Sequence, residues 1–213
     1  MKKSIFIPLL NETFELNEVF NVIIVEDPIA YRNLYYDDLD SYIYCEEGKI
    51  IELNKKIAKI ENPLSLNIND KKLLNGLYKS LEGLKNSEIQ EKLGLIESDI
   101  ISIMDCFIER TSFSLEYNDQ IDISKLFSMI QLRFREYSTI DYLNCLLSFV
   151  NINIELFDIK LIISFGLANY ISEEEMADLK KELELLGVII FDFSFRKKST
   201  NSAIIVDNDW CLI

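Results

Sequence analysis

Oxygen-bearing side chains gather in the segment from Glu116 to Asp122, which reads Glu-Tyr-Asn-Asp-Gln-Ile-Asp. Carboxylate and amide oxygens are the ligands that hard cations prefer, and Ca²⁺ binds about six to eight of them. The segment lacks the glycine and the twelfth-position glutamate of an EF-hand loop. Two interpretations stand. The segment forms a calcium site, or it is a plain loop in which Asp122 is the N-cap of the next helix.

Basic side chains recur in groups whose charge would suit contacts to phosphates without recognition of bases. One group precedes and enters a predicted strand, and another lines the polar side of a predicted helix. A pair of arginines on an extended segment would point the same way as the lysines of that helix. A last group lies near the C-terminus. These residues are Lys55, Lys56 and Lys59; Lys71, Lys72, Lys79 and Lys85; Arg133 and Arg135; and Arg196, Lys197 and Lys198. The alternative is an ordinary solvated surface.

Catalytic patterns are absent from the sequence. There is no G-x-x-x-x-G-K-[ST] phosphate loop, and the turn Glu26-Asp27-Pro28 after an apolar run is acidic, so it would repel a triphosphate. Gly166 is a single glycine at a strand end. The chain has no histidine, which excludes Ser-His-Asp and Cys-His nucleophiles and His-ligated metals. We therefore expect a protein that is not an enzyme.

The net charge of −14 opposes binding to nucleic acid, because phosphates repel a negative surface. Any DNA-binding hypothesis must depend on local basic patches. Residues 63–150 carry 9 basic and 13 acidic residues, and the remainder carries 13 and 23, so the middle of the chain is the less negative part. No stretch approaches the roughly 20 apolar residues of a membrane span. The N-terminal apolar run is too short for a secretory signal, so we expect a soluble, cytoplasmic protein.

The elements that must position these residues begin with short strands. The apolar and β-branched runs predict strands over 5–10, 21–25, 42–44, 50–53 and 57–60. Asp27 and Pro28 suit the N-cap and first turn of a helix that continues to about Tyr36. From Asp70 the apolar spacing becomes helical. It predicts helices from Asp70 through Leu81 and over 87–110, 121–130 and 139–149, with 131–135 extended.

The last third predicts a right-handed β-α-β unit. An apolar strand over 160–165 is followed by Ser172 and Glu175, which form a capping box, and Gly187 is a good helix C-cap. A strand over 188–193 follows, and further strands are expected over 203–206 and 210–213. The predicted fold is an α/β head from residues 1–62 and 151–213, with a mixed or parallel sheet, and a helical leg inserted at 63–150.

Several segments together resemble one family. LIISFGLANYISEEEMADLKKELELLGVIIFDFS, NVIIVEDPIAYRNLYY, FSLEYNDQIDISKLFSMI and VDNDWCLI resemble, in order and spacing, the small accessory (Csn-type) adaptation protein of type II-A CRISPR–Cas systems. The resemblance implies a head like that of P-loop ATPases without the phosphate loop, and an inserted helical leg. It also implies a homotetrameric ring that binds calcium and the ends of double-stranded DNA. Such proteins serve spacer acquisition together with the CRISPR integrase proteins and the effector nuclease.

The resemblance also assigns residues. Glu116 and Asp119 match acids of the family's leg loop, and Asn118 and Lys125 depart from its acidic pattern, which shifts the metal toward Asp122 or Glu109. Arg133 falls at a basic position of the family. The candidate DNA contacts are Lys55, Lys56, Lys59, Lys71, Lys72, Lys125, Arg133 and Arg135. A ring would reconcile DNA binding with the acidic chain, because positive side chains can face its centre.

Two other functions compete with a DNA clamp. The acidic surface could dock on a basic protein partner, and such a module would not bind DNA alone. A degenerate metal-dependent NTPase or nuclease would instead use carboxylates such as Glu26, Asp27 or Asp119. The missing phosphate loop counts against the NTPase or nuclease hypothesis. The acidity of the chain is consistent with the docking hypothesis, which therefore stays an alternative.

Overall fold

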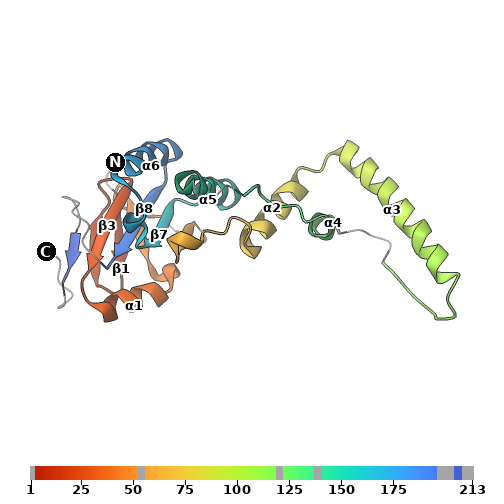
Figure 1. Cartoon of the computed structure of the whole chain (residues 1–213), viewed down its shortest axis with the longest axis horizontal. Helices are drawn as coiled ribbons and strands as arrows, with labels where there is room; N and C mark the ends of the chain where they lie inside the picture. Colours follow the sequence, from red (N-terminus) through yellow and green to blue (C-terminus); the bar gives the residue numbers. More distant parts are fainter. Residues whose placement is uncertain (1–2, 52–55, 119–121, 137–140, 196–203, 208–213) are drawn as a thin grey trace. The chain divides into compact units, whose positions relative to one another are not determined.

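The computed structural model describes residues 3–51, 56–118, 122–136, 141–195 and 204–207 (Figure 1). The chain divides into two compact units. The first comprises the described residues of 1–68 and 136–213, and the second comprises those of 69–135. The leg was predicted over 63–150, and the second unit is shorter at both ends. The helix over 142–157 belongs to the first unit.

The first unit contains a sheet of five parallel strands in the order β6-β7-β8-β3-β9. Every residue of β7 and β8 is buried, as expected for central parallel strands that are covered on both faces. The strand bounds are β3 Phe20–Val25, β6 Ile57–Ile60, β7 Leu161–Phe165, β8 Ile189–Ser194 and β9 Ile204–Val206.

A second sheet in the same unit has four antiparallel strands in the order β2-β1-β4-β5. Its strands are β1 Lys3–Ile7, β2 Glu12–Glu15, β4 Ile43–Glu46 and β5 Lys49–Ile51. The two sheets share one hydrophobic core. Within it the rings of Phe14 and Phe191 meet edge to face, with their centroids 5.5 Å apart.

Helices α1 and α6 of the first unit start and stop where local chemistry predicts. The carboxylate of Asp27 accepts a hydrogen bond from the Ile29 amide at the start of α1. Ser172 and Glu175 form the predicted capping box of α6, and Gly187, with φ of 67°, ends that helix. The helices are α1 Pro28–Tyr36, α5 Tyr142–Phe157 and α6 Glu173–Leu186, with 3₁₀ turns at Leu39–Ser41, Pro63–Ser65 and Leu167–Asn169. Helices α5 and α6 contact each other (Figure 1).

The second unit is helical, with α2 Lys71–Gly83, α3 Ser87–Ile108 and α4 Ile123–Met129. Helices α2 and α4 contact each other, and the rings of Tyr78 and Phe127 lie 5.6 Å apart between them. Helix α3 buries none of its residues in the described chain. No helix among the described residues is long and apolar enough to cross a membrane.

Candidate nucleic-acid interface

Helix α2 presents lysines on one exposed face. Asp70 caps the helix through a 2.9 Å hydrogen bond from the Leu73 amide, and Leu73 is buried. At 100° per residue, Lys71, Lys72 and Lys79 fall within one arc opposite Leu73, and all three are exposed. Lys72 and Lys79 are seven residues apart, which is about 10 Å along the helix axis. This spacing suits contacts to separate phosphates.

The extended segment after α4 carries the two predicted arginines beside α2. Leu132 and Phe134 are half-buried, whereas Arg133 and Arg135 are exposed, so the side chains alternate as the sequence predicts. The hydroxyl of Tyr78, on α2, donates a 2.9 Å hydrogen bond to the Leu132 carbonyl. We call Lys71, Lys72, Lys79, Arg133 and Arg135 the basic face.

The second unit is close to neutral in an acidic chain. Residues 69–135 contain 9 basic and 11 acidic residues, a net charge of −2, whereas the remainder contains 13 and 25. Asp70 caps α2, and Glu82 pairs with Lys85. The segments that carry the basic face, residues 70–85 and 131–135, contain six basic and two acidic residues. Lys125 is exposed on α4 in the same unit.

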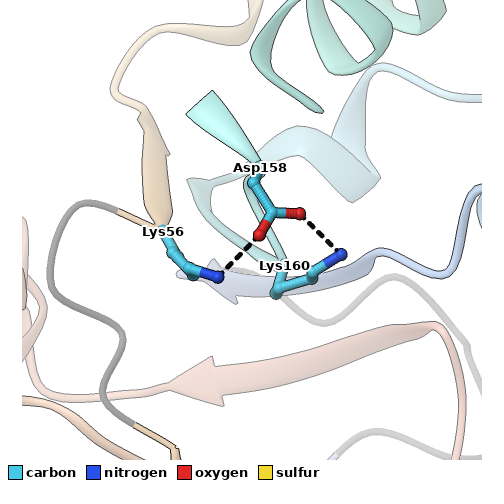
Figure 2. Close-up of polar contacts among 3 residues, drawn as sticks. All are labelled: Lys56, Asp158 and Lys160. Carbon is cyan, nitrogen blue, oxygen red and sulfur yellow. Dashed lines mark hydrogen bonds and ion pairs between the residues drawn. The ribbon is translucent and has the colours of Figure 1, made fainter. Parts of the chain in front are cut away.

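Lys56 and Lys160 of the first unit pair with the same carboxylate. The Asp158 carboxylate pairs with Lys56 at 2.6 Å and with Lys160 at 2.8 Å (Figure 2). These two lysines lower the pKa of Asp158 to about 2. Sequence reasoning named Lys56 but missed Asp158 and Lys160, because Asp158 is 102 residues from Lys56 and has no local signal. Lys55 lies outside the described residues.

Lys59, a residue of β6, also has several partners within the first unit. Its ammonium donates to the Tyr35 carbonyl, pairs with Glu61 at 3.3 Å, and lies 5.0 Å and 5.4 Å from the ring centroids of Tyr35 and Phe165. Its side chain is only 19% exposed. This lysine serves the fold of the first unit, and it offers little surface to DNA.

Glu109, Glu116 and Asp122, the predicted metal ligands that the structure describes, are exposed and do not form a cluster of three. Glu109 is the C-cap of α3, and Glu116 lies on the loop that follows. Asp122 is the N-cap of α4 and accepts a 2.9 Å hydrogen bond from the Ser124 amide, as predicted for this one residue. Among the described residues, no three acidic or sulfur side chains lie close enough to hold an ion. Asp119 falls outside the described chain, so Glu109, Glu116 and Asp122 do not by themselves fit calcium.

The loop after β7 has the backbone form of an anion site, but a carboxylate of the chain fills it. Gly166 has φ of 78°, and the amides of Leu167 and Ala168 donate to the Asp192 carboxylate at 2.9 Å and 3.0 Å. The Ser164 hydroxyl donates to it at 2.7 Å. These donors are therefore already used by Asp192.

Burial of Asp192 predicts a pH dependence of stability. The group is fully buried, and burial raises its pKa to about 6, against the opposite effect of the hydrogen bonds it accepts. A raised folded-state pKa means that this group stabilises the fold fully below about pH 4, and that the contribution is lost as pH rises through about 6. The free energy of unfolding of the wild type should therefore fall relative to that of Asp192→Asn across this window. Urea denaturation at a series of pH values measures the difference. A constant difference from pH 4 to pH 7 would contradict the shift.

Comparison with known proteins identifies the family. A family model described as CRISPR-associated protein (Cas_Csn2) matches residues 34–210. The match defines the chain as a CRISPR-associated protein. The chain belongs to the Cas_Csn2 family, as its resemblance to the type II-A accessory protein predicts, and this membership gives it a role related to CRISPR adaptation. No curated protein matches the chain.

One similar solved structure is an ABC transporter ATP-binding protein from Pyrococcus furiosus. It is 17% identical, with a TM-score of 0.40, over 96% of this chain and 97% of that chain. A similarity at this level carries no argument about the fold or the activity. The fold class therefore follows from the strand order itself: a mixed α/β protein with one parallel and one antiparallel sheet.

Proposed function

We propose that this chain is a non-catalytic protein that binds the ends of double-stranded DNA without sequence preference and acts in spacer acquisition. The observation that carries the proposal is the basic face, a set of exposed lysines and arginines on the less acidic of the two units. Lysines and arginines that contact phosphates give binding that ignores sequence and weakens with salt. Membership of the Cas_Csn2 family supplies the process.

The proposal includes a homotetrameric ring. Helix α3 supports assembly, because its apolar residues at 89, 93, 96, 100, 103 and 107 follow the alternating four-and-three spacing of a coiled-coil seam. Five of the six are exposed: Ile89, Ile96, Ile100, Ile103 and Phe107 are 37% to 64% exposed. A monomer in water gains nothing from such a seam, whereas pairing would bury it.

Absence of catalysis is part of the proposal. The chain has no histidine, and the loop amides that could bind a phosphate after β7 donate to Asp192 instead. The likeness of the head to P-loop ATPases, the cytoplasmic location, and the integrase and effector-nuclease partners extend the proposal from the family resemblance.

The test compares binding of a linear duplex with binding of the same duplex closed into a circle, at low salt and with Ca²⁺. A ring threaded from an end should bind only the linear form, and the protein should elute near four times the chain mass. Binding of neither form would contradict the proposal. It would favour the second candidate, an acidic module that docks on a basic protein, for which the net charge of −14 is the supporting observation.

A substitution at Asp158, which pairs with Lys56 and Lys160, tests whether the first unit contributes to DNA binding. Asp158 has φ of 52°, a left-handed conformation that asparagine also tolerates, so Asp158→Asn removes the charge with little backbone strain. If Lys56 and Lys160 approach DNA, the variant should bind the linear duplex about tenfold more tightly and with a steeper salt dependence. Fluorescence anisotropy measures both. Unchanged affinity would remove Lys56 from the interface. Asp178→Asn, on α6, is the matched control.

Structural calcium is a further part of the proposal and extends it from the family resemblance, with Asp119 as the acid that Glu109, Glu116 and Asp122 would need beside them. Adding Ca²⁺ to the metal-free protein should raise the melting temperature, because a ligand that binds only the folded state stabilises it. Glu116→Gln should remove the increase, whereas Glu88→Gln on α3 should leave it unchanged. Differential scanning fluorimetry with Ca²⁺, Mg²⁺ and EDTA measures the shift. An identical melting temperature in Ca²⁺ and EDTA would contradict the assignment.

A further inference from the structure

We infer that Asn69 and Tyr78 are positioning residues for DNA binding, which hold the segment that carries Arg133 and Arg135 against α2. This inference rests on the proposed function and adds to it two uncharged residues that need not touch DNA. Both side chains are partly buried, and both lie within the second unit. No local pattern singles them out, because their contacts join residues far apart in sequence.

Asn69 binds Phe134 as a neighbouring strand would. Its side-chain Nδ2 donates to the Phe134 carbonyl at 3.2 Å, and its Oδ1 accepts from the Phe134 amide at 2.9 Å. An asparagine amide can donate and accept at once, and this pair of bonds fixes the direction of the backbone as well as its position. The contact spans 65 residues of sequence.

Tyr78 provides a second point of attachment, at Leu132, two residues before Phe134. Its hydroxyl donates to the Leu132 carbonyl at 2.9 Å, and its ring packs near Phe127. The segment leaves α4 through Gln131, whose φ is 53°, and the Leu132 amide donates to the Phe127 carbonyl at 2.9 Å. The chain is thus turned back at the end of α4, with Leu132 attached to Tyr78 of α2 and Phe134 attached to Asn69, just before α2.

Attachment at alternate residues decides where the arginines point. Successive side chains of an extended segment lie on opposite sides. Because Leu132 and Phe134 are half-buried, Arg133 and Arg135 are presented to solvent. Without the attachments, the segment would have to be ordered when DNA binds, and that ordering weakens affinity without removing any phosphate contact.

The experiment measures affinity for a linear duplex at several salt concentrations. The proteins are the wild type, the positioning variant Asn69→Ala/Tyr78→Phe, the contact variant Arg133→Ala/Arg135→Ala, and the control Asn33→Ala/Tyr36→Phe, which makes the same changes at exposed positions of α1. The positioning variant should bind about tenfold more weakly with an unchanged slope of log affinity against log salt. The contact variant should bind more weakly, and its slope of log affinity against log salt should be smaller by about 1.8, because two phosphate contacts are removed.

Amide hydrogen exchange gives a readout independent of DNA. The positioning variant should exchange faster at Leu132 and Phe134 while α2 and α4 keep their protection, which distinguishes a released segment from an unfolded unit. Tyr78→Phe alone is the milder form if the double variant unfolds. Wild-type affinity in the positioning variant, or a slope reduced like that of the contact variant, would overturn the inference and leave the proposed function standing. Failure of the wild type to bind DNA would overturn both.

Discussion

Replacing Lys71, Lys72 and Lys79 with alanine is expected to reduce affinity for a linear duplex by roughly 10³-fold at about 50 mM salt. Each lost phosphate contact removes about 0.9 from the slope of log affinity against log salt, so the slope should fall by about 2.7. The three side chains lie on the exposed face of α2, opposite the buried Leu73, so the substitutions leave the packing of the helix intact. Fluorescence anisotropy across a salt series measures both quantities.

A matched variant separates local contacts from net charge. Lys92→Ala/Lys180→Ala/Lys181→Ala removes the same three positive charges from sites that pair with Glu88, Glu18 and Asp178. This control should change affinity by less than about threefold, because these lysines lie outside the basic face and the hypothesis assigns no phosphate contact to them. Equal losses in both triple variants would show that only the total charge matters. No loss in either would remove the basic face from the interface.

Phe191→Ala should produce the largest loss of stability, about 3–5 kcal/mol. Phe191 is 0% exposed, and its ring contacts those of Phe14 and Phe193 where the two sheets meet. Truncation removes buried apolar area and leaves a cavity between the two sheets. The cavity persists because neither sheet can move in to fill it without disturbing its packing against the other. The melting temperature of the first unit should fall by about 10 °C or more, as measured by scanning calorimetry.

Two comparisons show whether the loss comes from the core. Phe113→Ala makes the same change at a ring that is 74% exposed and should alter the free energy of unfolding by less than about 0.5 kcal/mol. Phe191→Leu keeps most of the volume and should lose clearly less than the alanine variant. If Phe191→Ala and Phe113→Ala unfold at similar temperatures, the shared core between the sheets does not hold the first unit together.

The limits of prediction lie mainly at element ends and at polar strands. The strand expected over 5–10 ends at Ile7, because Leu10 and Asn11 form a turn in which Asn11 adopts a positive φ. Strand β2 was not predicted, since Glu12–Glu15 has a single buried residue, Phe14. Helix α5 continues to Phe157, eight residues beyond the predicted end, and stops at Asp158. The strand expected over 210–213 lies outside the described residues.

Local sequence by itself determined the helix caps and the central strands. Asp27 with Pro28, Ser172 with Glu175, and Gly187 act on backbone groups within about four residues, so their effects can be read from the chain. The continuous apolar runs that became β3, β7 and β8 are typical of buried parallel strands. Exposure of the α2 lysines follows equally from helical spacing.

Only the tertiary structure decided which distant residues meet. Asn69 and Phe134, Lys56 and Asp158, and Ser164 and Asp192 are 65, 102 and 28 residues apart, and nothing within a few residues of either partner indicates the other. Their contacts depend on strand order and on the path of the chain, which arise from the packing of whole elements. The charges of the candidate interface could therefore be listed from sequence, whereas their pairing, their orientation and the residues that hold them could not.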